Sequence, residues 1–191
     1  PKPTTTTTTT MSEVEDTKDI DVSVTGDILD DKGNAKPGTI SVTVPTAVNF
    51  TVTKTGALTA GDMVITNNSK EKVKVSVKGF SDPNGDKNIN IIKRTDFEGQ
   101  GEASNVDRKK IWLNITGRGV SVGFESADKG KMYDPSNDST VTAKEIGSLD
   151  ANGGKMQLEL QGAGGTNGND PSSEPIKDNF NLVLKIERDR Q

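Results

Sequence analysis

The sequence predicts an all-β protein, an antiparallel β-sandwich of the jelly-roll or Ig-like kind with an extended N-terminal arm. Three observations favour this class. Val and Ile together number 28 and Thr adds 22, whereas Leu numbers only 8, and β-branched side chains pack better on a pleated sheet than in a helix. Apolar and polar residues alternate along many short segments, as in strands with one buried and one solvated face. The 20 Gly and 8 Pro residues supply turns between such strands.

Residues 1–18 form the predicted arm, and residues 19–191 form a single predicted sandwich domain. The arm begins with Pro1-Lys2-Pro3 and continues with seven threonines. Residues 1–35 hold three Lys and eight Asp or Glu, a net charge of −5, while the other 156 residues have a net charge of +1. A Thr/Pro tract is typical of a flexible or O-glycosylated stalk, but Thr is also a good strand former. Both interpretations stay open, and any signal peptide is expected to have been removed, because no charged start precedes an apolar run.

About ten strands are predicted in the domain, each bounded by Gly, Asn, Asp or Pro. In chain order they are Ile20–Val24, Ile40–Val44, Val48–Val52, Met63–Thr66, Val73–Val77, Ile89–Ile91, Ile111–Ile115, Val120–Phe124, Met156–Leu160 and Phe180–Ile186. One short helix is predicted over Ser139–Leu149, where Ser139 or Thr140 could cap it. The glycine-rich stretch 162–169 is predicted to be a long loop, because it lacks the spacing of phosphate-binding motifs.

The strand between Lys72 and Lys78 alternates valine with lysine. Such a pattern is typical of a guarded sheet edge, although an ordinary solvated face would give it too. Asp19 and Asp21 flank Ile20 in a complementary acidic pattern. Pairing the acidic segment with a lysine-bearing strand, within one subunit or between two, would contribute about 0.2–1 kcal/mol per cross-strand pair.

Composition excludes several kinds of chemistry. With no His and no Cys, the chain has no thiol nucleophile, no Ser-His-Asp triad and no zinc site of the usual ligands. Asp82, Asn84 and Asp86 alternate as in a calcium loop, but Lys93 stands where the bidentate Glu belongs, and a simple turn explains them equally. Trp112 is expected on the face opposite its apolar neighbours, as a buried anchor or an interface residue. We predict no enzyme activity, no cofactor, no nucleic-acid binding and no membrane insertion.

Three stretches together carry a resemblance to a known class: Gly38–Pro45, Asn49–Val52, and Leu58–Ser69 with its Gly61-Asp62 and Asn67-Asn68-Ser69. They resemble secreted, cysteine-free β-sandwich surface proteins of Gram-positive bacteria, including the TasA/camelysin type of extracellular fibre subunit. The resemblance implies a location at the cell surface or in a biofilm matrix. It also implies donor-strand complementation, in which an N-terminal strand of one subunit completes a sheet of the next.

The predicted function is therefore that of a structural subunit of an extracellular filament or pilus. Its partner is the chain itself, with other surface or matrix components as further candidates, and head-to-tail strand exchange generates an open polymer. The acceptor-edge candidates are Val73, Val75 and Val77. The donor-strand candidates are Thr4, Thr5, Thr6, Thr7, Thr8, Thr9, Thr10, Val14, Ile20, Val22 and Val24. The alternative is a monomeric adhesion or glycan-binding module on a Thr-rich stalk, although one Trp and one Tyr offer few platforms for sugar stacking.

Overall fold

The computed structural model describes residues 40–82, 88–125, 143–170 and 172–190, together with the backbone alone of residues 17–20 and 132–133. Strands dominate these residues, which confirms the predicted β class. The helices described are α1 (Arg94–Glu98) and a 3-10 turn at Ala103–Asn105. The described part of the chain contains no helix with the length and hydropathy needed to cross a bilayer.

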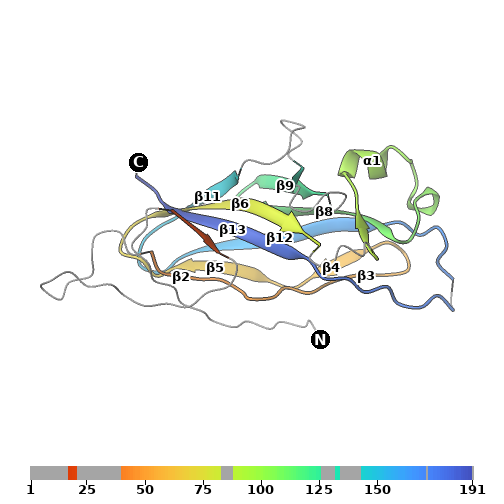
Figure 1. Ribbon diagram of the computed structural model, residues 1–191, viewed down its shortest axis with the longest axis horizontal. Helices are drawn as coiled ribbons and strands as arrows, with labels where there is room; N and C mark the ends of the chain where they lie inside the picture. The colour runs from red at the N-terminus through yellow and green to blue at the C-terminus, as the bar shows by residue number, and fades with distance from the viewer. Residues whose placement is uncertain are drawn as a thin grey trace, which may run out of the picture.

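The strands form two larger sheets and one hairpin (Figure 1). The four-stranded sheet, called the β6 sheet, has the order β1 (Thr17–Ile20), β13 (Asn181–Arg188), β6 (Val73–Ser81) and β11 (Lys144–Leu149). The second, called the β12 sheet, has the order β10 (Met132–Tyr133), β9 (Val120–Phe124), β8 (Lys110–Gly117), β12 (Gly154–Gly164), β5 (Met63–Asn67) and β2 (Val42–Thr43). β7 (Asn90–Ile91) joins β8 in parallel, and the other strand pairings described are antiparallel.

Side chains from both sheets meet in one hydrophobic core. The β6 sheet contributes the buried valines of β6 with Ile186 of β13, and the β12 sheet contributes Ile65, Leu113 and Leu158. β6 has a bulge between Val77 and Gly79, which pair with Leu184 and Val183 of β13. The extra residue shifts the alternation of faces along β6. Val77 and Phe80 are therefore both buried, although they are three residues apart. The predicted strands at Met63–Thr66, Val73–Val77, Ile111–Ile115, Val120–Phe124 and Met156–Leu160 are confirmed.

The small hairpin of β3 (Phe50–Val52) and β4 (Leu58–Ala60) packs on the C-terminal half of β12. Two glycines of β12 make this approach possible. A Cβ atom on Gly164 would lie 2.5 Å from Val52 Cγ1, and one on Gly162 would lie 2.8 Å from Leu58 Cδ1. Glycine in a strand commonly marks such a close approach. The prediction of a loop over 162–169 is therefore wrong for residues 162–164, which belong to β12.

The predicted helix at Ser139–Leu149 is also wrong for the residues described, because Lys144–Leu149 form β11, paired with β6. A bulge at Ile146 explains the error. The register skips from Glu145 to Gly147, so Ile146 and Leu149, three residues apart, are both buried. This spacing of apolar residues is typical of a helix, yet here a bulged strand produces it.

The valine and lysine strand is internal to its sheet, so of the two interpretations left open the guarded sheet edge does not fit it. β6 pairs with β13 along one side and with β11 along the other. Its valines are fully buried, while Lys74 and Lys78 lie on the opposite, more accessible face. Alternation does not distinguish an internal strand from an edge strand, because the face opposite the valines carries polar residues in both cases. On that face Lys74 is half-buried, Ser76 is buried and Lys78 is exposed.

Candidate functional site

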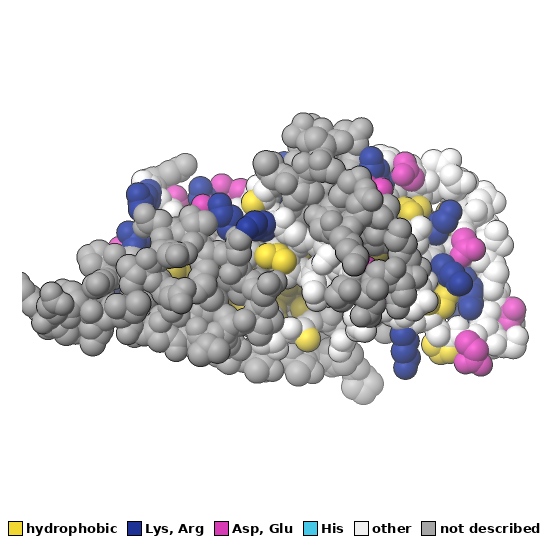
Figure 2. Space-filling view, viewed as in Figure 1, with side chains coloured by type: hydrophobic (Ala, Val, Ile, Leu, Met, Phe, Trp, Pro, Cys, Tyr) yellow, Lys and Arg dark blue, Asp and Glu magenta, His cyan; other side chains and the backbone are white. Residues whose placement is uncertain are grey.

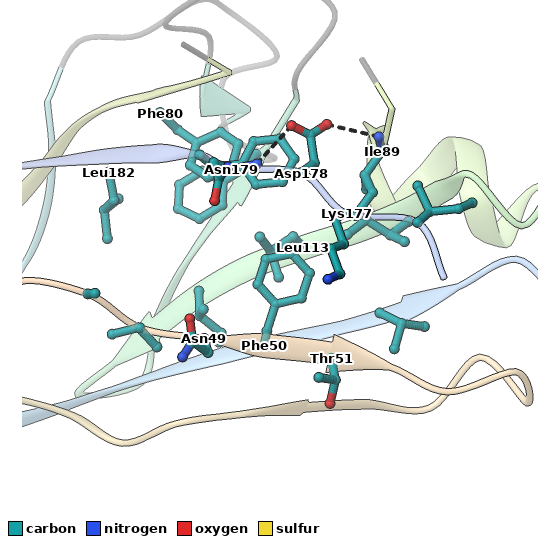
Figure 3. A pocket seen from close by; sticks show the side chains of 18 of the residues that line it. Asn49, Phe50, Thr51, Phe80, Ile89, Leu113, Lys177, Asp178, Asn179 and Leu182 are labelled. Atoms are coloured by element: carbon teal, nitrogen blue, oxygen red, sulfur yellow. Dashed lines mark hydrogen bonds between the residues drawn. The ribbon is translucent and has the colours of Figure 1, made fainter. Parts of the chain in front are cut away.

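An apolar groove of about 1090 Å³ lies between two segments that are far apart in the sequence. Residues 44–54 form its first wall and residues 173–182 form its second wall. Buried core side chains, among them Phe80, Leu113 and Phe124, line its base. Figure 3 shows the Phe50 ring pointing from the first wall toward Leu113, and Leu182 on the second wall. The groove therefore reaches side chains of the hydrophobic core.

Four of the five phenylalanines form a continuous cluster that spans the groove. The ring centroids of Phe50 and Phe180 lie 6.3 Å apart, those of Phe180 and Phe80 5.2 Å, and those of Phe80 and Phe124 4.2 Å. Phe80 and Phe124 are buried, whereas Phe50 and Phe180 are half-buried. Each such pair contributes about 0.5–1.5 kcal/mol beyond its buried area. The cluster thus joins the two walls while leaving apolar ring surface accessible.

Hydrogen bonds hold the second wall in place. The carboxylate of Asp178 accepts bonds from the backbone N–H of Ile89, at 2.9 Å, and of Asn179, at 2.8 Å (Figure 3). At the far end of this wall, Arg108 Nη1 donates to the carbonyl oxygen of Glu174 at 3.3 Å. These bonds therefore anchor the backbone of the second wall at two points that precede Phe180 in the sequence.

Charges of both signs surround the groove. Lys54, Arg108 and Lys177 line it together with Glu174 and Asp178. Figure 2 likewise shows Lys and Arg side chains interspersed with Asp and Glu at the end of the molecule that carries α1. The mixed rim does not select an occupant of one charge, so recognition in the groove is expected to depend on shape and apolar contact.

Asp170 lies beside the first wall, where Lys54 Nζ donates to its carbonyl oxygen at 2.6 Å. Hydrogen bonds from the hydroxyl and then the backbone N–H of Ser172, at 2.6 and 2.8 Å, hold the pKa of Asp170 below its ordinary value of 3.8. The bonds stabilise the ionised carboxylate. Its role is to shape the turn that leads into the second wall.

Among the described residues, β1 pairs with only part of the margin of β13 beside the groove. β1 pairs with Leu184–Glu187, with Ile20 opposite Leu184 and Lys18 opposite Ile186. In the part of the chain that the structure describes, no strand pairs with Asn181–Val183 on this side. Leu182 is half-buried there and lines the groove. In the described part of the chain, a strand that is paired over only part of this margin therefore borders the apolar groove.

The predicted site residues fall in different places. Among the donor candidates, Ile20 lies in β1, while Thr4–Thr10, Val14, Val22 and Val24 lie outside the described residues. Val73, Val75 and Val77 are buried in an internal strand, so the acceptor edge predicted there is wrong for this structure.

The remaining candidates are Trp112 and the possible calcium ligands. Trp112 is half-buried on the face opposite its buried neighbours, where Arg94 of α1 covers it with its guanidinium carbon 4.7 Å from the ring centroid. Asp82 is buried, and Asn84 and Asp86 lie outside the described residues.

Searches against protein-family models, curated proteins and solved structures found no match. Sequence reasoning missed the groove itself. Its walls come from two segments separated by most of the chain, and a pattern within either segment does not report their contact. One usable signal was Phe180, which follows the irregular, polar stretch 170–179 and begins the apolar alternation of the last strand.

Proposed function

We propose that the chain is a structural subunit of an extracellular filament at the cell surface or in a surrounding matrix, and that copies join head to tail by strand addition. The observation that supports this function is the margin of β13 beside the apolar groove, where no strand among the described residues pairs with Asn181–Val183. A strand added there would pair with the backbone of this margin while its alternate side chains filled the groove. The acceptor in this proposal is β13, in place of β6.

The N-terminal segment is the proposed donor. β1 already uses the margin of β13, with Thr17–Ile20 antiparallel to Leu184–Glu187. If the same segment from a neighbouring copy took this place, each subunit would give one strand and receive one. Such a contact joins two different surfaces, so it repeats without limit and forms a filament. The shared core supports the further proposal that the β6 and β12 sheets are the layers of an antiparallel sandwich of the jelly-roll or Ig-like kind.

Truncation tests the proposal. We would compare the intact chain, a variant lacking residues 1–16 and a variant lacking residues 1–24, by size-exclusion chromatography and negative-stain electron microscopy. Filaments are expected from the intact chain and not from the variant lacking residues 1–24, because that variant has lost the donor strand. The variant lacking residues 1–16 retains β1 and therefore separates the contribution of the Thr tract.

Circular dichroism would show that each variant is folded. If the intact chain remained a compact monomer across a wide range of protein and salt concentrations, the filament proposal would be wrong. A monomeric adhesion module would then be the better description.

A further inference from the structure

We propose that the β12 sheet binds an uncharged polysaccharide on the face that it turns away from the hydrophobic core. The surface concerned, called the outer strip, runs along β12. Met156 and Leu158 of β12 are buried in the core, so the residues that alternate with them point to the other face. These residues are all exposed, and they are Lys155, Gln157, Glu159 and Gln161.

Side chains of the paired strands complete the outer strip. Residues directly opposite each other in an antiparallel pair have their side chains on the same face of the sheet. β5 thereby contributes Val64 and Thr66, and β8 contributes Asn114 and Thr116. In the part of the chain that the structure describes, Val64 is the one large hydrophobic residue that is exposed, at 40%. It lies opposite Gln157, so a small apolar spot adjoins an exposed amide.

The outer strip differs in charge from the corresponding face of the β6 sheet. That face carries ion pairs, in which Lys74 Nζ lies 3.9 Å from Glu145 Oε2 and Lys185 Nζ lies 2.8 Å from Glu187 Oε1. The outer strip has one lysine and one glutamate, and its other polar groups are amides and hydroxyls. A surface that serves solubility alone is commonly built from charges of both signs. The neutral polar groups of the outer strip therefore point to a ligand.

The same chemistry favours a neutral, hydroxyl-rich ligand over the alternatives. Nucleic acids and acidic glycans are polyanions, which bind to clusters of Lys and Arg, whereas Lys155 lies on the same strip as Glu159. A protein partner needs an apolar centre in its interface, and Val64 alone does not supply one. A carboxamide donates and accepts hydrogen bonds at once, as a sugar hydroxyl does. The two groups are thus complementary without any net charge.

Gln157 and Gln161 are available for such hydrogen bonds. Both are exposed, and neither amide has a hydrogen-bond partner among the described residues. Four residues along a strand span about 13 Å, so a ligand that reaches both amides is an oligosaccharide or polysaccharide rather than a single sugar. Asn114 and Thr116, in contrast, are held in place, because both donate to Ser121 Oγ, at 3.2 and 3.1 Å.

Aromatic stacking is not the basis of this recognition. Trp112 lies on the same face, opposite Ala163, but the guanidinium carbon of Arg94 lies 4.7 Å from the centroid of its ring. We therefore expect weak binding by one molecule, which repetition along a filament would strengthen. The inference does not depend on the filament, because the acceptor margin proposed above belongs to the β6 sheet.

Affinity electrophoresis of the intact chain tests the inference. Native gels would contain dextran, galactomannan or hydroxyethylcellulose as neutral polymers, alginate as an anionic polymer, or no polymer. We expect slower migration in at least one neutral gel and unchanged migration in alginate. The double variant Gln157→Ala with Gln161→Ala should weaken the retardation by about fivefold or more, because two hydrogen bonds are lost.

The matched control is the double variant Lys74→Ala with Glu145→Ala, on the outward face of the β6 sheet. Both double variants keep the net charge of −4, so they should migrate like the intact chain without polymer, and circular dichroism would show that they are folded. The control should be retarded as strongly as the intact chain. Retardation in no neutral gel, retardation by alginate alone, or equal retardation of the two double variants would overturn the inference.

Size-exclusion chromatography of the same samples separates this inference from the filament proposal. Retardation of a chain that stays monomeric at all concentrations would support the outer strip and refute the filament. Filaments that no neutral polymer retards would refute the outer strip and leave the filament proposal standing.

Discussion

Replacing Gly162 by alanine should destabilise the protein through a single misplaced methyl group. The added Cβ would clash with the carbonyl oxygen of Trp112 on the paired strand β8 and would lie 2.8 Å from Leu58 Cδ1. The leucine tip can rotate, but the carbonyl belongs to the sheet backbone. Overpacking of this kind costs about 1–3 kcal/mol, and alanine returns about 0.4–1 kcal/mol by restricting the unfolded chain. We expect a net loss of between about 0 and about 2.6 kcal/mol, and a fall in Tm of up to several degrees.

Gly79→Ala is the matched control, because Gly79 also lies in a strand. Its added Cβ would lie 3.5 Å from the Cβ and Cγ2 atoms of Val183, an ordinary van der Waals contact. This variant should be neutral or more stable by up to about 1 kcal/mol. Urea unfolding followed by the fluorescence of Trp112, the single tryptophan, gives both midpoints. Equal midpoints for the two variants would refute the claim that Gly162 is required by the packing of β8 and the β3–β4 hairpin against β12.

Three further variants test the core, a buried polar contact and a surface turn. Leu158→Ala removes a fully buried side chain and should lower the free energy of unfolding by about 2–5 kcal/mol in urea titrations. The Asn67 side-chain amide donates hydrogen bonds to the backbone carbonyls of residues 71, 149 and 150, at 2.8, 3.2 and 2.9 Å. Asn67→Ala removes this donor and should lower the free energy of unfolding by about 1–3 kcal/mol for each carbonyl left unpaired. The control, Asn68→Ala at the exposed neighbouring residue, should change the free energy of unfolding by less than about 0.5 kcal/mol. The pKa of the Asp170 carboxyl is held below 3.8 in the folded protein. The ionised carboxylate therefore stabilises its turn at pH values above the pKa that Asp170 has in the unfolded chain. This contribution is lost as the pH falls through the lower pKa of Asp170 in the folded protein. NMR titration should show that Ser172→Ala raises the pKa of Asp170, and an unchanged midpoint would contradict this.

The sequence predicted individual strands well because a two-residue period is a local property. The sequence did not predict the position of each strand within its sheet, since that position depends on which distant segments pair with it. Val73–Val77 is a clear example, because its pattern would be the same with or without β11 and β13 as neighbours. At β11 the local signal itself was misleading, because the bulge at Ile146 produces the apolar spacing of a helix.

The groove lay beyond sequence reasoning for a related reason. Phe50 and Phe180 each look like ordinary strand residues, and only the folded chain brings their rings to 6.3 Å. The apolar alternation of Ile20, Val22 and Val24, in contrast, was visible directly. The structure adds the register of Ile20 against Leu184, which places the described end of this alternation beside β13.

The place of β6 also determines when the sheets can form during synthesis. β6 ends at Ser81, but both of its neighbours, β11 and β13, come from residues after 143. Because the chain is synthesised from its N-terminus, β6 is made before the two strands that pair with it. Until those strands are synthesised, the valines of β6 belong to an unpaired apolar strand, and such strands tend to aggregate. Lys72, Lys74 and Lys78 would keep other copies away by repulsion during this interval. These lysines would then protect the nascent chain from aggregation until β6 is paired with β13 on one side and β11 on the other.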